Sequence, residues 1–140
     1  MRAAGLALSL ALVIAGLLAA PAGAGVRHFH GRISGGGVVD FDVLYASGKP
    51  KKAGNFELEN VPVRCDPNNT RVDFSTASVV PVDGRKFVYV FRGFTAKIAG
   101  RLKPNGILAS GNVDYGPNDL DTTGRMGCTT DGPRGWNAHR

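Results

Sequence analysis

Hydrophobic and polar residues alternate along most of the chain after residue 25, with the period of two that is typical of β-strands. Three segments in the first half place apolar side chains on one face and polar side chains on the other. The expected inward residues are Phe29 and Ile33 in residues 26–33, Val39, Phe41, Val43 and Tyr45 in residues 38–45, and Phe56 and Leu58 in residues 55–63. The expected outward residues are His28, His30, Arg32, Asp40, Asp42, Glu57 and Glu59. These segments predict half-buried strands, separated by a turn at residues 34–37 and a loop over residues 46–52.

The clearest pattern lies between Arg85 and Tyr115, where three strand-like segments follow one another. Asn105-Gly106 stands between the last two, and Asn-Gly is a strong hairpin signal because both residues tolerate positive φ. A two-residue loop pairs Leu102 with Ala109, whereas a three-residue loop beginning at Pro104 would shift the register and move one strand's side chains to the wrong face. We therefore expect the two-residue loop, which also places Lys97 opposite Asp114. The expected inward face is Ala96, Ile98, Leu102, Ala109, Val113 and Tyr115, and the outward face carries Lys97, Arg101 and Lys103.

The remaining strand-like segments complete an all-β pattern. Residues 87–91 are apolar on both faces, which favours a central strand over an edge strand. Short strands are expected at residues 72–74 and 77–82, and a last strand runs through Trp136 and Ala138. Amphipathic helices are absent from the pattern, and 20 glycines favour tight turns. About eight or nine short antiparallel strands predict a β-sandwich, with a small β-barrel as the alternative.

The N-terminal segment predicts export. Arg2 is followed by an Ala-, Leu- and Gly-rich run from Ala3 to Ala20 and by small residues ending in Ala22-Gly23-Ala24, which together indicate a signal helix cleaved after Ala24. An uncleaved membrane anchor is the alternative, but the run is diluted by Ala and Gly and ends at a cleavage motif. The expected organisation is a signal peptide over residues 1–24 and a single β-sandwich domain over residues 25–140. That domain is expected to be secreted, to the periplasm or the cell exterior, with no transmembrane segment after cleavage.

The chain contains two cysteines, Cys65 and Cys128. An even number of cysteines in an exported chain favours a disulfide between them. A metal site or a redox pair would need closer cysteine spacing, such as Cys-x-x-Cys. We expect a structural disulfide that stabilises the fold by closing a long loop.

A series of short motifs runs along the mature chain. They are Phe29-His30-Gly31, Cys65, Gly100-Arg101-Leu102 with Ala109-Ser110-Gly111, and Cys128, Gly132 and Trp136-Asn137-Ala138-His139-Arg140. In these motifs the chain resembles a loose group of small uncharacterised exported bacterial β-sandwich domains with a two-cysteine frame. The resemblance covers nearly the whole mature domain and implies the fold and the export. It brings no catalytic residues with it.

Charge suggests one candidate binding surface. The net charge is +6, and it falls to +5 without residues 1–24, which hold one arginine and no acid. Lys97, Arg101 and Lys103 are expected on one strand face and could bind an anionic polymer of the cell envelope. A second cluster, Lys49, Lys51 and Lys52, is expected on a loop. The alternative is that these residues are simply solvated, with Asp114 compensating Lys97.

Other candidate sites have weaker support. His28 and His30 share a strand face and could ligate a metal, with His139 joining if the termini are adjacent. Oxygen ligands between Asp114 and Asp121 could bind calcium but are also ordinary turn residues. Trp136 could stack on a sugar, but a core position is favoured. We expect no metal and no cofactor.

The chain contains none of the familiar catalytic motifs, such as Gly-x-Ser-x-Gly or His-Glu-x-x-His, and Ser34-Gly35-Gly36-Gly37 is a turn and not a phosphate loop. The expected function is therefore a non-catalytic binding module, secreted or associated with the cell envelope. A structural envelope protein and a hydrolase without a recognisable motif are the alternatives.

Overall fold

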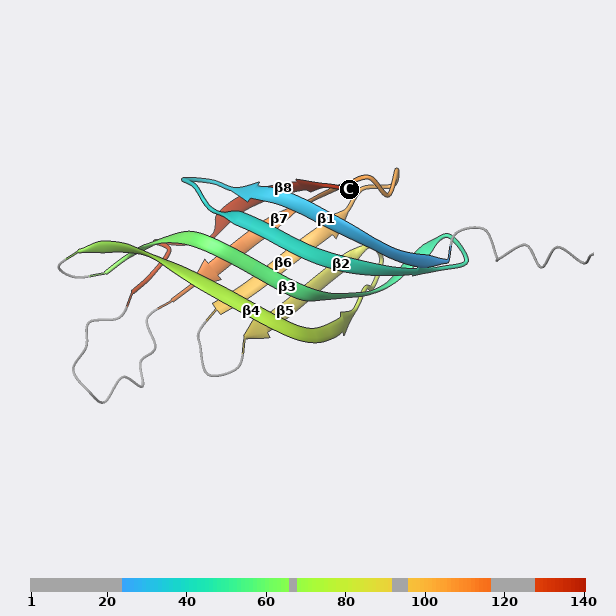
Figure 1. The fold of residues 1–140 in the computed structure, drawn as a ribbon, viewed down its shortest axis with the longest axis horizontal. Coiled ribbons are helices and arrows are strands. Elements are labelled where there is room, and N and C mark those ends of the chain that lie inside the picture. The colour runs from blue at the N-terminus through green and yellow to red at the C-terminus, as the bar shows by residue number, and fades with distance from the viewer. Residues whose placement is uncertain (1–23, 66–67, 92–95, 117–127) are drawn as a thin grey trace, which may run out of the picture.

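Eight β-strands account for most of the residues that the computed structural model describes, which are residues 24–65, 68–91, 96–116 and 128–140 (Figure 1). The predicted signal peptide falls on residues 1–24, of which residues 1–23 lie outside this part. All strand pairings are antiparallel. The strands are β1 (Gly25–Ile33), β2 (Val38–Ala46), β3 (Lys49–Arg64), β4 (Asn69–Pro81), β5 (Lys86–Phe91), β6 (Ala96–Leu102), β7 (Leu108–Tyr115) and β8 (Arg134–His139).

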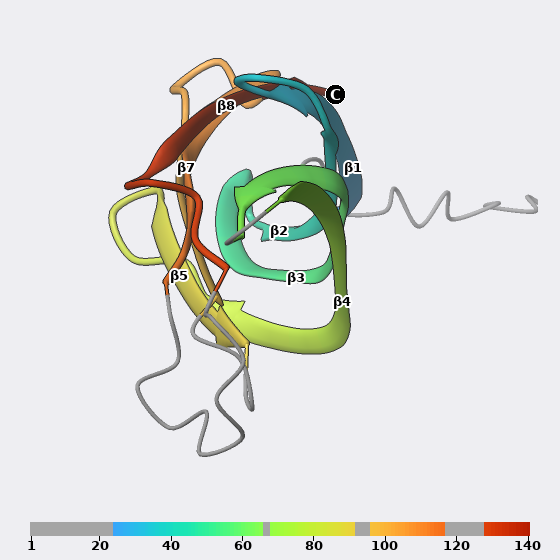
Figure 2. The ribbon, with the colours of Figure 1, turned by 90° about the vertical axis from the view of Figure 1, so that its left-hand side faces the viewer.

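The strands form one sheet in the order β4-β3-β2-β1-β8-β7-β6-β5. Strands β1 to β4 and β5 to β8 are two runs of consecutive hairpins, and the pairing of β1 with β8 joins them from Ile33 opposite Trp136 to His30 opposite His139. The sheet curls until its end strands approach, as the view along it shows (Figure 2). The predicted all-β antiparallel class is confirmed, and of the two arrangements considered the chain adopts the barrel. A sandwich would require two sheets, and the β1–β8 pairing makes them one.

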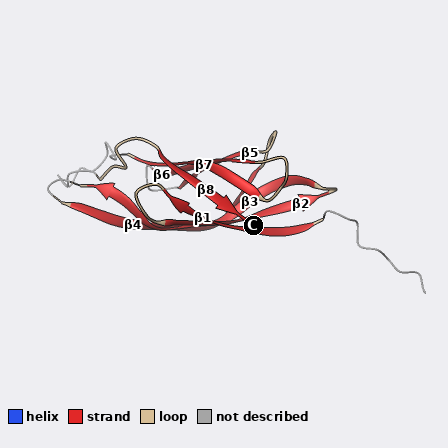
Figure 3. Cartoon of the chain, turned by 90° about the horizontal axis from the view of Figure 1, so that it is seen from above, coloured by secondary structure: helices blue, strands red, loops and turns tan. Residues whose placement is uncertain are grey.

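Side chains close the barrel where the backbone does not. β4 and β5 are the two end strands of the sheet. The Thr76 and Tyr89 hydroxyls are hydrogen-bonded across the gap at 3.1 Å, and the rings of Phe74 and Phe91 lie 5.5 Å apart. Seen from above, the barrel is flattened, with β5 to β7 along one side and β1 to β4 along the other (Figure 3). A flattened barrel has two facing layers of strands, as a sandwich does, so the same strand pattern is compatible with either arrangement.

Inward-facing side chains fill the interior of the barrel. Phe41 is fully buried and contacts four other rings at centroid distances of 5.2 to 5.9 Å, those of Phe29, Phe56, Phe87 and Trp136. Burial of each such side chain contributes about 1.5–3 kcal/mol. An eight-stranded barrel is just wide enough for side chains to fill it. Binding sites are therefore to be sought on the outer face and at the two ends.

The strand boundaries correct three of the predictions. The expected loop over residues 46–52 is a tight turn at Ser47-Gly48, so the three lysines that follow it lie on β3. The two short strands expected at residues 72–74 and 77–82 form one strand, β4, which Pro81 ends. The expected central strand, β5, is an end strand of the sheet, and its outward residues Val88 and Val90 are 53% and 57% exposed.

The β6–β7 hairpin has the predicted register. Leu102 pairs with Ala109 and Lys97 with Asp114. The loop is longer than expected, because Lys103 still pairs with Leu108 (N to O, 2.8 Å) and Pro104–Ile107 make the turn. A two-residue and a four-residue loop centred on the same peptide bond give the same register, so the pairing was correct although the turn was not. Gly106 has positive φ (65°), and the side chain of Asn105 accepts hydrogen bonds from the backbone of Ile107 and Leu108.

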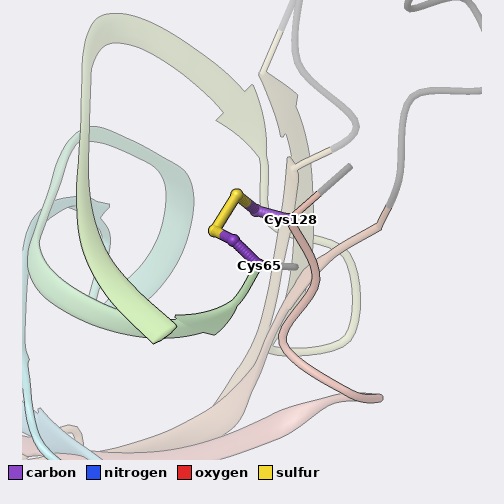
Figure 4. Close-up of a disulfide and its surroundings, with 2 residues drawn as sticks. All are labelled: Cys65 and Cys128. Atoms are coloured by element: carbon purple, nitrogen blue, oxygen red, sulfur yellow. A yellow bond between two sulfur atoms is a disulfide. The ribbon is translucent and has the colours of Figure 1, made fainter. Parts of the chain in front are cut away.

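The predicted disulfide is present (Figure 4). Cys65 and Cys128 are bonded, with a Cα–Cα distance of 4.2 Å, well within the limit of about 7 Å for a disulfide. Next to them, Arg64 and Thr129 exchange two backbone hydrogen bonds of 2.7 and 2.8 Å. The disulfide therefore attaches the segment before β8 to the end of β3.

The two ends of the barrel are formed by different turns. The β1–β2 turn, at the left of Figure 1, and the disulfide lie at one end, which we call the disulfide end. The turns between β2 and β3, β4 and β5, and β6 and β7 lie at the other, because alternate turns of an up-and-down barrel share an end. We call this second end the basic end, for the residues described next.

Candidate anion-binding site

Basic residues gather at the turns of the basic end. The residues at these turns and at the adjoining strand ends include Lys49, Lys51 and Lys52, Arg85 and Lys86, and Arg101 and Lys103, with Arg27 near the start of β1. Asp83, in the β4–β5 turn, is the acidic residue closest to them in the chain. Parts of two basic clusters that are separate in the sequence thus meet at one end of the barrel, Lys49, Lys51 and Lys52 from one and Arg101 and Lys103 from the other.

A pocket of about 490 Å³ opens between these turns. Its basic lining residues come from four separate segments, and none of its lining residues is acidic. Tyr45, Pro104 and Asn105 are among the other residues that line it. We call this site the basic pocket, and its five basic residues are Arg27, Lys49, Lys51, Arg85 and Lys103.

Contacts between the turns hold the basic pocket together. The guanidinium of Arg27 lies 3.8 Å from the centre of the Tyr45 ring, and its Nη1 donates to the Gly106 carbonyl at 3.4 Å. The Lys51 carbonyl accepts from the backbone of Val82 at 2.9 Å. The carbonyl of Arg85 accepts from Leu102 at 2.8 Å. These contacts fix the backbone at the walls of the pocket while the cationic groups remain without carboxylate partners among the described ion pairs.

The strand face predicted to bind an anionic polymer is only partly continuous with this pocket. Lys97, Arg101 and Lys103 are exposed, as expected for outward residues of β6 and its turn. Lys103 lines the basic pocket, whereas Lys97 lies near the disulfide end of β6. Lys97 is opposite Asp114 in the register, but no ion pair joins them in the described part of the chain, and Thr130 Oγ1 donates to Asp114 at 3.3 Å.

Arg27 and Arg85 were missed as candidate residues. Counting turns could have found them, because strands that alternate in direction place every second turn at the same end. Arg85 lies in one of these turns, and Arg27 is two residues into β1 at the same end. Only the pairing of β1 with β8, which is distant in sequence, settles that these turns surround one opening.

A histidine–aspartate network occupies the outer face of β1 and β2, away from both ends. The ring nitrogens of His28 lie 3.0 Å from Asp42 Oδ1 and 3.1 Å from Asp40 Oδ1, and His30 Nδ1 lies 2.8 Å from Asp40 Oδ1. The hydrogen bond to Asp42 raises the pKa of His28 above its ordinary value. Partial burial acts to raise the pKa of Asp42, but hydrogen bonds from Asn55 (2.8 Å) and His28 outweigh it and lower that pKa.

The sequence pattern suggested a metal at these histidines but missed their carboxylate partners. The β1–β8 pairing does bring His139 next to His30, with ring centroids 6.4 Å apart. Within the described residues, however, no group of three or more His, Cys, Asp or Glu side chains is arranged to hold a metal ion. The observed register is centred on Gly35 and pairs His28 with Asp42, whereas symmetry about the expected turn at residues 34–37 would have paired His28 with Val43.

The two other predicted sites have different outcomes. Trp136 is 1% exposed and packs against Phe41 and Phe87, which confirms the core position and leaves no ring face for a sugar. Of the proposed calcium ligands, Asp114 is on β7, and residues 117–121 lie outside the described residues.

No family model, curated protein or solved structure matches the chain. The resemblance to exported two-cysteine domains is therefore supported in its disulfide, and its remaining motifs stay a prediction. Among the residues that the structure describes, no helix is both long enough and apolar enough to cross a membrane. The disulfide is compatible with a periplasmic or extracellular location.

Proposed function

We propose that the protein is an exported, non-catalytic module that binds an anionic polymer of the cell envelope through the basic pocket. The observation that carries the proposal is that the pocket is lined by five basic residues and no acidic one. When these residues neutralise charges of the polymer, counterions condensed on the polymer are released, and this gives affinity without base-specific or sugar-specific contacts. The signal-like N-terminus and the disulfide support an exported location.

The basic pocket replaces the β6 strand face as the centre of the proposed surface. Lys103 belongs to both, but Lys49 and Lys51 belong to the pocket alone and Lys97 and Arg101 to the strand face alone. Positive charge that converges from several turns creates a stronger local potential than charge spread along one exposed strand. The two surfaces can therefore be separated by substitution.

A hydrolase has less support than binding. An active site is expected where a pocket and ionisable groups with shifted pKa values coincide. His28 and Asp42, whose pKa values are shifted, lie on the outer face of the sheet and line neither the basic pocket nor the pocket at the disulfide end. A structural role in the envelope is the outcome if no polymer binds.

Titration with defined polymers at low and high salt tests the proposal. Polyphosphate and poly-glutamate serve as probes, with dextran as an uncharged control, and binding is followed by calorimetry. We expect binding of both polyanions that weakens as salt rises, and no binding of dextran. Replacing Lys49 and Lys51 by Gln should reduce the slope of log affinity against log salt by about two, about one for each lost contact.

A double variant with the same charge loss gives the matched control. Lys97→Gln with Arg101→Gln removes two positive charges from the β6 face and should change the slope by less than half as much. If this control loses affinity and the Lys49/Lys51 variant does not, the pocket is the wrong surface. Absence of salt-dependent binding to both polyanions would refute the function itself.

A further inference from the structure

A second pocket, of about 940 Å³, lies at the disulfide end and is lined by three arginines from three different strands. They are Arg64 at the end of β3, Arg71 on β4 and Arg134 at the start of β8. We call this site the arginine pocket. Its other lining residues are three with apolar or sulfur-containing side chains, three with neutral hydrogen-bonding side chains and one acid. They are Pro62, Val63, Cys65, Asn69, Thr70, Thr129 and Asp131.

The charges in the arginine pocket are only partly compensated. Three arginines against one aspartate give a formal charge of +2. Arg64 Nη1 pairs with Asp131 Oδ2 at 3.2 Å, and both side chains are more than half exposed. Among the described ion pairs, Arg71 and Arg134 have no carboxylate partner. Two cationic groups in this pocket thus remain available to an anionic ligand.

Backbone carbonyls hold these two guanidiniums in place without neutralising them. Arg71 Nη1 donates to the Asn60 carbonyl at 3.0 Å, and Arg134 Nη1 donates to the Ser34 carbonyl at 3.4 Å. Each bond uses one of the five N–H donors of a guanidinium. The Nε of Arg134 is buried and has no hydrogen-bond partner in the described part of the protein.

Both guanidiniums lie against the β1–β2 turn. A Cβ atom at Gly36 would lie 2.8 Å from Arg71 Nη1, and a Cβ atom at Gly35 would lie 2.6 Å from Arg134 Nη1. The two arginines thus contact consecutive residues of one turn, whose glycines leave room for them. An arrangement fixed before binding lowers the entropy that binding costs.

We propose that the arginine pocket binds the phosphate group of a small phosphomonoester. The guanidinium fork matches phosphate oxygens in a bidentate manner, and the pocket charge of +2 matches the charge of a phosphomonoester near neutral pH. Thr70, Thr129 and Asn69 supply further hydrogen-bonding groups around this charge. The volume falls within the range of small-molecule sites.

This site is separate from the basic pocket and does not depend on it. The two pockets lie at opposite ends of the barrel and share no lining residue. A phosphomonoester would bind through two arginines that are each hydrogen-bonded to a backbone carbonyl, whereas the polymer is bound by charge spread over several turns. The two proposals can therefore fail independently.

Calorimetric or NMR titration with phenyl phosphate and inorganic phosphate tests the proposal on the full mature chain. We expect saturable binding of both probes, with chemical shift changes at Arg71 and Arg134, and no binding of neutral phenyl glucoside. Arg71→Gln should weaken binding by about tenfold or more, because it removes charge-assisted hydrogen bonds. Arg71→Lys keeps the charge but loses the fork, and should recover only part of the affinity.

Two further variants separate this site from general charge attraction. Asp131→Asn raises the formal pocket charge and should strengthen binding several-fold. Arg85→Gln removes a positive charge from the basic pocket and should leave phenyl phosphate binding unchanged while weakening polyphosphate binding. Because Arg71 is exposed, its substitution leaves the core intact, and unfolding curves verify this.

The proposal is overturned by any of three results. The first is no saturable binding of either phosphate probe to the wild-type chain. The second is equal affinity in the wild type and in Arg71→Gln. The third is an equal loss in Arg71→Gln and Arg85→Gln, which would show that the phosphate responds to net charge and not to this pocket.

Discussion

At the residue level, His28 and Asp42 make the stability of the barrel depend on pH. The pKa of His28 is raised in the folded state, so its contribution is fully present below its ordinary pKa of 6.5 and is lost as pH rises through the folded value. The pKa of Asp42 is lowered, so its contribution is present above its ordinary pKa of 3.8 and is lost as pH falls through the folded value. The pair is therefore most stabilising between these two values.

We expect Asp42→Asn to lower the pKa of His28 and to destabilise the protein more at about pH 5 than at about pH 8. The His28 side chain is 63% exposed, so the pair is worth only about 0.2–1 kcal/mol. NMR titration of the His28 ring and urea unfolding at both pH values measure the two effects. Glu59→Gln, which removes an outward carboxylate of β3, is the control and should leave the His28 titration unchanged. An unchanged His28 pKa in Asp42→Asn would contradict the network.

At the level of strands, two glycines on adjacent strands should respond very differently to substitution. A Cβ at Gly111 on β7 would clash with the Ala99 carbonyl and lie 2.6 Å from the Trp136 ring. A Cβ at Gly135 on β8 would meet no atom closer than 3.9 Å. Gly111 thus lets the indole of Trp136 lie directly against the β6–β7 backbone in the core, whereas Gly135 has free space.

We expect Gly111→Ala to lower the free energy of unfolding by about 1–3 kcal/mol, because backbone and a core ring must move. Gly135→Ala should change it by less than about 0.5 kcal/mol. Urea unfolding followed by the fluorescence of the chain's one tryptophan, Trp136, gives both values. Similar stability of the two variants would show that the close contact at Gly111 is not constrained.

The strands also show which features could be predicted from sequence. Alternation is a local property, and it correctly assigned the inward faces of β1, β2, β3, β6 and β7. The exposure of Val88 and Val90 was not predictable in this way, because apolar residues on both faces of β5 resemble a central strand. Whether a strand is central depends on which strands pair with it. Here β1 pairs with β8, at the far end of the chain, and the sheet therefore ends at β4 and β5.

The two pockets illustrate the same limit at the level of the whole molecule. Each depends on residues from separate strands that only the curled sheet brings together. Arg27 and Lys103 are 76 positions apart in the chain yet line one pocket, and Arg64 and Arg134 line the other. Charge runs in the sequence identified Lys49, Lys51 and Lys103 but not the isolated arginines that complete these sites.

The disulfide should stabilise the whole molecule and, in particular, the end that holds the arginine pocket. Cys65 and Cys128 are 63 positions apart, and closing a loop of this size stabilises a fold by about 4 kcal/mol in the chain-entropy model. Cys65 lines the arginine pocket, and Cys128 is bonded to it next to Thr129, which also lines that pocket. The basic pocket lies at the opposite end and includes neither cysteine.

We therefore expect the double variant Cys65→Ala, Cys128→Ala to lose up to about 4 kcal/mol of unfolding free energy. Under conditions where this variant is still folded, phenyl phosphate binding should weaken because Thr129 and the segment leading to Arg134 are no longer held against the end of β3, whereas polyphosphate binding should persist. Urea unfolding and the two titrations measure these effects. The control is the wild type, measured once with its disulfide intact and once with reductant. Equal losses of both ligands in a folded variant would mean that the disulfide organises the whole barrel and not one end, because only a distributed change could reach a pocket at the opposite end.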